Sequence, residues 1–251
     1  MKLTHESRNK IMTSGCSWTE GINSNQNWPD ILSDKLRKEN SNYGMSGAGN
    51  QYIYNQVVDN YNNEDLICVL WTGFDRWDFE DLNGRKTISM TNKHPKEVWD
   101  ALTEANFMEP LFNLKRNLRY IHGFQNFCEA NKIKYIHALA FTDVWCPSWA
   151  PTGSYVANSG SQIRYLKEFI DYNIHDYIND DHFIGWPCFN EMQGYTMSNH
   201  LQDAEPDQKG WRRNPKFRIS STDWHPNKEG HSIIANLFYD RYIELYGNPA
   251  S

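Results

Sequence analysis

Three short segments of the chain carry residue types suited to nucleophilic catalysis, and the first is Gly15-Cys16-Ser17-Trp18-Thr19. It follows a short apolar segment, Ile11-Met12-Thr13, which reads as a strand. A serine on a tight turn between a strand and a helix exposes its hydroxyl and presents its own backbone N–H to a developing oxyanion. Ser17 is therefore a candidate nucleophile. The alternative is that its side chain only caps the turn.

The second segment is glycine-rich and runs from Asn42 to Asn50, with the sequence Asn-Tyr-Gly-Met-Ser-Gly-Ala-Gly-Asn. Glycines ahead of a helix let the backbone approach an anion closely, and the free N–H groups of the first helical turn supply hydrogen-bond donors. The segment is thus a candidate anion-binding turn. An ordinary turn that leads into a capped helix would have a similar sequence.

The third segment is Asp223-Trp224-His225-Pro226, just before the last expected helix. Asp223 and His225 are two residues apart, so in an extended chain their side chains project to the same side and Trp224 points the other way, towards packing. Pro226 favours this geometry because it disfavours the α region for the residue before it. A carboxylate that orients an imidazole beside a serine is the arrangement of a Ser-His-Asp relay. The alternative is a surface hydrogen bond.

Other nucleophiles and metal ligands are weighed on the same basis. Cys16 is the rival nucleophile, because a thiol beside a helix N-terminus can be activated, but neighbours at a strand end point to opposite sides, so Cys16 and Ser17 cannot both face one cleft. The nine His and five Cys show no ligand spacing typical of zinc sites. We expect neither a metal nor a cofactor, and we expect His231, on the last helix, to pack or to cap.

The elements that must position these segments alternate between strands and helices, which predicts an α/β fold with a parallel sheet. Ligands bind at the carboxyl ends of the strands in such sheets. Residues 142–222 are less regular, with one helix expected near 162–179. The other expected elements are strands at 66–71 and 133–141, a helix that starts after Asn27, and helices whose apolar faces span 54–61, 111–128 and 234–245.

Composition excludes several classes of function. Hydrophobic residues make up 39% of the 251 residues, and 10 Trp, 14 Tyr and 12 Phe add large buried area, so a globular core is expected. A net charge of −6 argues against a nucleic-acid binder and against anionic membrane surfaces. The sequence contains no long apolar run, so no membrane span is expected. It has no apolar N-terminal segment, so no secretory signal is expected either. Five irregularly spaced cysteines favour reduced thiols, and hence a cytoplasmic location.

Taken in this order, the three segments resemble the motifs of the SGNH (GDSL-type) hydrolase superfamily, particularly its divergent phage and bacterial members with a Gly-Cys-Ser-Trp start. The resemblance implies a three-layer α/β/α sandwich with a central parallel sheet of flavodoxin-like order. It also implies that Ser17 is the nucleophile and an oxyanion donor, Gly47 a second donor, His225 the general base and Asp223 the acid that orients it. Ser17 rather than Cys16 fits the family position, and a phage origin would allow a virion-associated location.

The chain departs from the family pattern at three places. Gly15-Cys16-Ser17 replaces Gly-Asp-Ser, and Asp-x-His at 223–225 is one residue shorter than Asp-x-x-His. In the third block, Gly-x-Asn-Asp in the family, Asp75 occupies the position of the asparagine that donates to the oxyanion. An ionised carboxylate only accepts hydrogen bonds. Either Asp75 is protonated, or Arg76 or Thr72 donates instead, or the third donor is absent at a cost of ~10²–10³ in rate.

The resulting prediction is a serine esterase built as one domain over residues 1–251, because Ser17 and His225 lie near opposite ends and must meet in one site. The substrate is expected to be a small-molecule or polysaccharide ester, with O-acyl groups on carbohydrate favoured because aromatic rings are frequent in 142–222. Those rings are Trp145, Trp149, Tyr155, Tyr165, Trp186, Tyr195 and Trp211. The alternative is that they belong to the core. An alternative function is a catalytically silent module that binds carbohydrate or belongs to a virion. No oligomeric state is predicted.

Overall fold

The computed structural model describes residues 9–22, 24–81, 84–88, 100–102, 104–105, 109–141, 166–171, 176–201, 215–220, 223 and 225–249. Its centre is a five-stranded sheet in the order β2-β1-β3-β6-β7, and each neighbouring pair runs parallel. This is the flavodoxin-like order, so that prediction is confirmed. The strands are β1 (Lys10–Gly15), β2 (Glu39–Gly44), β3 (Leu66–Trp71), β6 (Lys134–Leu139) and β7 (Phe183–Ile184).

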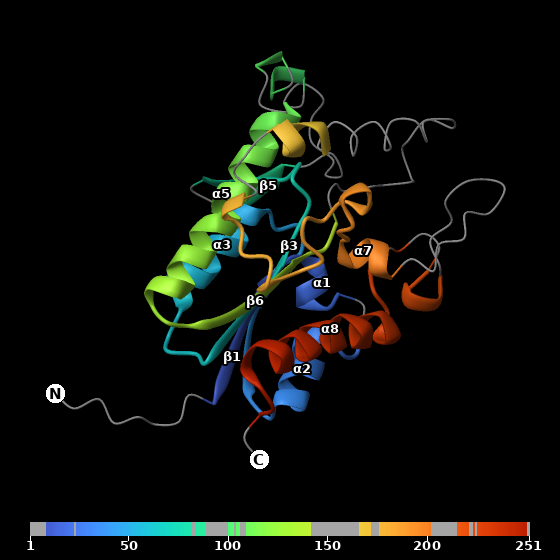
Figure 1. Cartoon of the computed structure of the whole chain (residues 1–251). Helices are drawn as coiled ribbons and strands as arrows, with labels where there is room; N and C mark the ends of the chain where they lie inside the picture. Colours follow the sequence, from blue (N-terminus) through green and yellow to red (C-terminus); the bar gives the residue numbers. More distant parts are fainter. Residues whose placement is uncertain are drawn as a thin grey trace.

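Helices cover both faces of this sheet and complete the predicted three-layer α/β/α sandwich (Figure 1). On one face α3 (Asn50–Asn60) packs beside α5 (Pro110–Ala130), and on the other α2 (Trp28–Leu36) packs beside α8 (Lys228–Tyr246). The sheet therefore has no solvent-exposed face at its centre, and all six residues of β3 are buried. This explains the continuous apolar sequence of β3, which is typical of a strand covered on both sides.

The helices follow the apolar spacing read from the sequence. α5 buries one stripe at helical intervals, formed by Leu114, Leu118, Ile121, Phe124 and Cys128. α2 begins as expected, because the Asn27 side chain accepts a hydrogen bond from the Asp30 N–H and Pro29 lies in the first turn. The predictions for these helices are confirmed.

The packing of α2 against α8 joins the first third of the chain to its last helix. Trp28 stacks on Phe238 with ring centroids 4.6 Å apart. The Trp28 N–H at the start of α2 donates to Nδ1 of His231, 3.3 Å away. His231 thus packs and caps, as expected, and the contact holds the N-termini of both helices close together.

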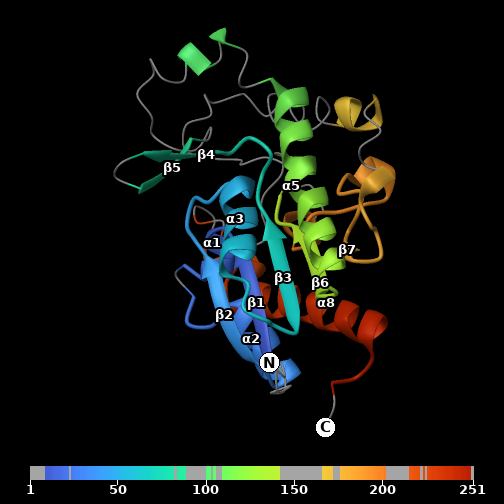
Figure 2. The same cartoon turned by 90° about the vertical axis from the view of Figure 1, so that its left-hand side faces the viewer.

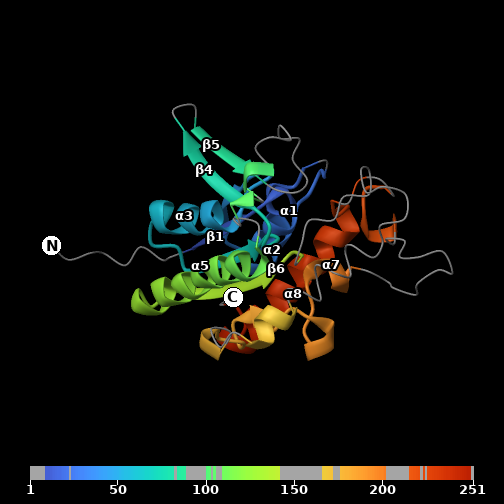
Figure 3. The ribbon, with the colours of Figure 1, turned by 90° about the horizontal axis from the view of Figure 1, so that it is seen from above.

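Part of the chain differs from the sequence-based expectation. An antiparallel hairpin of β4 (Trp77–Asp81) and β5 (Gly84–Ile88), not predicted, extends away from the central sheet (Figures 2 and 3). The helix expected near 162–179 is described over 166–171, and 178–180 are not helical. The expectation of loops around that helix was wrong for β7 and for α7 (Met197–His200), which are too short to show a periodic pattern.

The described part of the chain contains no helix that is long and apolar enough to cross a bilayer.

Candidate active site

Ser17 lies at the carboxyl end of β1, where the strand turns directly into α1 (Ser17–Glu20). The turn is tight enough to require glycine at position 15, since an added Cβ would lie 2.0 Å from Thr19 Oγ1 and 2.9 Å from the Leu70 carbonyl oxygen. The Cys16 side chain is fully buried, whereas Ser17 remains 7% exposed. The structure therefore separates the two candidate nucleophiles, with the thiol in the core and the hydroxyl in contact with His225.

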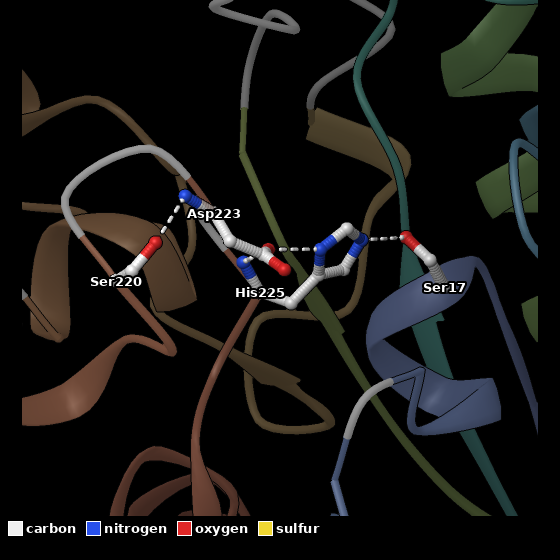
Figure 4. Close-up of polar contacts among 4 residues, drawn as sticks. All are labelled: Ser17, Ser220, Asp223 and His225. Carbon is white, nitrogen blue, oxygen red and sulfur yellow. Dashed lines mark hydrogen bonds and ion pairs between the residues drawn. The ribbon is translucent and has the colours of Figure 1, made fainter.

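The structure brings Ser17, His225 and Asp223 together in one chain of hydrogen bonds (Figure 4). His225 Nδ1 lies 2.6 Å from Asp223 Oδ1, and His225 Nε2 lies 3.0 Å from Ser17 Oγ. Because a carboxylate accepts hydrogen bonds, the Nδ1–H donates to Asp223, and the neutral ring is left with Nε2 as an acceptor for the Ser17 hydroxyl. About 30% of each of the His225 and Asp223 side chains is exposed, so the site is open to a substrate.

His225 is held by a short antiparallel strap in which residues 217–220 pair with residues 223 and 225–227. The Ile219 N–H donates to the His225 carbonyl oxygen, and Asn227 N–H to that of Phe217. The Asp223 N–H donates to Ser220 Oγ, 2.9 Å away (Figure 4). Asp223 and His225 share one side of this extended segment, as their spacing predicted. Trp224 lies outside the described residues.

The glycine-rich segment runs from the end of β2 to the start of α3, and the loop between them is tied to the turn that carries Ser17. The Met45 N–H donates to the carbonyl oxygen of Gly15, and the Ser46 N–H donates to Glu20 Oε2 at 2.6 Å. Gly47 adopts a φ of 72°, which favours glycine. Its N–H has no acceptor among the described residues, so it is available to a ligand.

Two N–H groups at the N-terminus of α3 are already bound to a side chain, contrary to the expectation that they are free for an anion. Asp78 accepts hydrogen bonds from the N–H groups of Gly49 and Tyr52, both at 2.9 Å. A carboxylate of the chain itself therefore caps α3 and compensates the positive end of the helix dipole. The Gly49 and Tyr52 N–H groups are therefore occupied, whereas the Gly47 N–H in the loop ahead of the helix is available.

The loop after β3 carries the residues weighed as third oxyanion donors. Both carboxylate oxygens of Asp75 are shielded from solvent, and so is Thr72 Oγ1. The Thr72 N–H donates to Asn50 Oδ1, and its carbonyl oxygen accepts from Asn50 Nδ2. Arg76 is buried as well, and its Nη1 donates to the carbonyl oxygen of Ala48 at 2.8 Å.

An aromatic wall, formed by the rings of Trp18 and Phe141, lies next to Ser17. The Trp18 ring packs edge-on against Phe141, with centroids 5.5 Å apart, and the guanidinium of Arg218 lies over it at 4.6 Å. Burial lowers the pKa of Arg218 to about 10, so it remains charged at neutral pH. Trp18 thus joins the helix that carries the serine to the strap that carries the histidine.

The aromatic rings proposed to bind sugar are described only in part. Trp186 packs on Phe169 and Phe183, and Tyr195 packs on His200. These two rings therefore belong to the packing of the protein. The remaining five, Trp145, Trp149, Tyr155, Tyr165 and Trp211, lie outside the described residues.

Three functional contacts were not found from the sequence, namely those of Glu20, Asn50 and Asp78. Each side chain binds the backbone of a different segment, 22 to 29 residues away. No spacing rule signals such a pair, although Asn50 lies at the end of a segment that the sequence did single out. Within the described ranges, no group of three or more His, Cys, Asp or Glu side chains could hold a metal ion.

No protein-family model matches the chain. No curated protein matches it either. Solved structures do. The chain is similar to a GDSL-like lipase from Bacteroides thetaiotaomicron VPI-5482, with 15% identity and a TM-score of 0.52 over 96% of this chain and 92% of that one.

Two further structures align along most of their length. One is described as a lipolytic protein of the G-D-S-L family from Desulfitobacterium hafniense DCB-2, at 15% identity and a TM-score of 0.49 over 93% of this chain and 99% of that one. The other is an acetylxylan esterase from Geobacillus stearothermophilus, solved as a catalytic mutant, at 14% identity and a TM-score of 0.43 over 93% of both chains. The assignment rests on the Bacteroides lipase, which has the highest TM-score of the three. Together with the strand order and the three layers, it shows that the chain has the fold of the SGNH (GDSL-type) hydrolases.

Proposed function

We propose that this protein is a serine esterase that hydrolyses small carboxylic esters through Ser17, His225 and Asp223. The observation that carries the proposal is the hydrogen-bonded chain from Asp223 through His225 to Ser17. A nucleophile in contact with a base, which is itself oriented by an acid, is the arrangement of acyl-transfer enzymes on unrelated folds.

In the proposed reaction, Ser17 Oγ attacks the carbonyl carbon of the ester while His225 Nε2 takes the hydroxyl proton. The carbonyl π electrons move to oxygen and form the tetrahedral oxyanion. When the intermediate collapses, the C–O bond to the alcohol breaks and Nε2 returns its proton to the departing oxygen. Water then repeats the same steps on the acyl-enzyme, which releases the carboxylic acid and restores the serine.

The Ser17 and Gly47 N–H groups are proposed as oxyanion donors. Ser17 is the first residue of α1, and the Gly47 N–H is available in a loop tied to the same turn. Donors fixed before the reaction cost no reorganisation when charge develops on the oxygen. We leave Asp75 out of this set because its carboxylate oxygens are both shielded from solvent.

The test is the release of p-nitrophenol from p-nitrophenyl acetate by the purified protein. Ser17→Ala and His225→Ala are expected to lose the activity above the uncatalysed rate by at least roughly 10³-fold, because each removes a group that acts in every turnover. Cys16→Ala is the matched control and is expected to keep its activity, since the thiol is buried. Equal rates for Ser17→Ala and the wild type would refute the proposal.

A carbohydrate O-acyl group is the proposed natural substrate. Its support is the frequency of aromatic rings in the sequence of 142–222. Trp186 and Tyr195 no longer count towards that support, because they pack within the protein. A screen for acetate released from acetylated glycans, with long-chain acyl lipids as the comparison, tests it. Activity confined to the lipids would contradict it.

The second candidate is a catalytically silent module that uses the cleft only for binding, favoured by the carboxylate at position 75. The two functions differ in covalent chemistry. An esterase is labelled stoichiometrically at Ser17 by a fluorophosphonate, as read by mass spectrometry of the peptide that contains it. A silent module binds glycan saturably without that label.

A further inference from the structure

A charged guanidinium is buried beside the proposed oxyanion loop. Arg76 is 8% exposed, and its Nη1 donates to the carbonyl oxygen of Ala48, the residue after Gly47. Its guanidinium carbon lies 5.5 Å from the centroid of Phe141, whose ring packs against Trp18 next to Ser17. The group is thus placed between the loop that carries Gly47 and the aromatic wall beside the nucleophile.

Most of the hydrogen-bonding capacity of this guanidinium is unused. Arginine has five N–H donors, and the bond to Ala48 occupies one of them. Nε is buried with no acceptor, and Arg76 forms no salt bridge with any residue that the structure describes. Burying a charge without a partner is costly. The arrangement indicates an anionic partner that is present only during the reaction.

The other candidates for a third donor are occupied or shielded. The Thr72 N–H is bound to Asn50, Thr72 Oγ1 is buried, and the two oxygens of Asp75 are shielded from solvent. Of the three side chains weighed as a third donor, Thr72, Asp75 and Arg76, only Arg76 keeps N–H groups without an acceptor among the residues that the structure describes.

We infer that Arg76 supplies the third oxyanion donor of this site, in place of an amide side chain at position 75. The inference rests on the proposed esterase function and names a further catalytic residue for it. A charge-assisted hydrogen bond is about twice as strong as a neutral one, and its strength grows as negative charge develops on the substrate oxygen. Arg76 therefore stabilises the transition state more than the bound ester, and its loss lowers kcat rather than raising KM.

The experiment measures kcat and KM for p-nitrophenyl acetate, and the rate of Ser17 phosphonylation by a fluorophosphonate, in Arg76→Met, Arg76→Lys and Arg76→Ala. Arg76→Met is expected to lower kcat by ~10²–10³ with KM within about threefold, and to slow phosphonylation in parallel. Arg76→Lys retains the charge but lacks the planar fork, so it recovers only part of kcat. Added guanidinium ion is expected to raise kcat of Arg76→Ala and to leave the wild type unchanged.

Arg116→Met is the matched control for damage to the loop. The Arg116 guanidinium braces the same segment through the carbonyl oxygen of Arg76 at 2.6 Å, but it lies over the Trp77 ring on the side of α5. A loop effect would lower kcat in both Arg76→Met and Arg116→Met. The inference is overturned by such a parallel loss, by a kcat of Arg76→Met within threefold of wild type, or by a change in KM alone, which would indicate ground-state binding.

Failure of the inference differs from failure of the proposed function. If hydrolysis depends on Ser17 and survives in Arg76→Met, only the role of Arg76 falls. If Ser17→Ala is as active as the wild type, the esterase proposal falls and the role of Arg76 with it.

Discussion

His225 receives two contacts from one oxygen atom of Asp223. Oδ1 accepts from the backbone N–H of His225 at 3.1 Å and from its Nδ1 at 2.6 Å. The carboxylate therefore fixes both the path of the backbone and the tautomer of the ring. At the scale of the single residue, this bond decides whether Nε2 can receive the serine proton.

Asp223→Asn is expected to lower kcat for p-nitrophenyl acetate by roughly 10³–10⁴. The amide can donate to Nδ1, which moves the ring proton to Nε2 and removes the acceptor for Ser17. Ser220→Ala is the control, since Ser220 Oγ accepts from the backbone N–H of Asp223 and leaves the carboxylate in place, and it should retain kcat within about tenfold. A kcat for Asp223→Asn close to that of the control would contradict the assigned role of the carboxylate.

At the scale of the element, hydrogen bonds connect α1, the loop that carries Gly47 and the N-terminus of α3 at the carboxyl end of the sheet. Glu20 of α1 accepts from the Ser46 N–H in the loop that carries Gly47, and Asn42 of β2 donates through Nδ2 to the carbonyl oxygen of Thr19 at 2.9 Å. The Gly47 loop then passes into α3, which is capped from the hairpin by Asp78. Contacts from β2, from α1 and from the β4–β5 hairpin thus hold the nucleophile and the loop of the proposed donors in place.

Asp78→Ala is expected to destabilise the protein by about 1–2 kcal/mol, because the Gly49 and Tyr52 N–H groups lose their acceptor and the helix dipole loses a compensating charge. The free energy of unfolding from urea titration, followed by circular dichroism, measures the effect. Asp59→Ala provides the comparison, because Asp59 lies exposed near the other end of α3 and should change stability by at most about 0.5 kcal/mol. Equal losses in the two variants would exclude a cap by Asp78.

At the scale of the whole molecule, buried imidazoles connect the stability of the fold to pH. Burial lowers the pKa of four histidines: His231 at the α2–α8 contact, His137 in β6, His182 just before β7 and His200 at the end of α7. Each is neutral in the folded protein at a pH where the unfolded chain binds a proton. The contribution of these histidines to stability is therefore complete above pH 6.5 and is lost as the pH drops below that value.

His231 contributes to this effect because burial lowers its pKa to about 4 from 6.5. The unfolded chain binds a proton here between these values and the folded one does not, so stability is lost as pH falls from 6.5 towards 4. At about 1.4 kcal/mol for each tenfold change in proton affinity, the loss is about 3 kcal/mol. His231→Asn keeps an acceptor for the Trp28 N–H and should remove this component from the pH dependence of the free energy of unfolding.

The control for that measurement is His122→Asn on α5, whose ring bonds Asn126 in an exposed position. It should retain the wild-type slope between pH 6.5 and 4. An unchanged slope in His231→Asn would show that His231 does not contribute to the acid sensitivity.

Features that depend on interactions between residues close in the sequence were predicted, and features that depend on distant residues were not. β3, α5 and the start of α2 were predicted because apolar periodicity and capping are local. Ser17, Asp223 and His225 were predicted because each lies at a strand end or a proline-flanked extended segment. The β4–β5 hairpin and the two-residue β7 were missed, since short strands depend on partners elsewhere. The contacts of Glu20 and Asp78 were missed for the same reason.

The strap that bears His225 has a consequence for the order in which the protein matures. Four of the five sheet strands are complete by Leu139 and the fifth by Ile184, whereas the base is 208 residues beyond the serine it contacts. As the chain leaves the ribosome, the sheet can be assembled while the proposed catalytic base is still unsynthesised. Residues 217–246, which follow all five strands in the sequence, supply both the histidine and the helix that closes the second face. The proposed hydrolysis would then begin only when that layer is in place, and a chain that lacks it would not cleave esters.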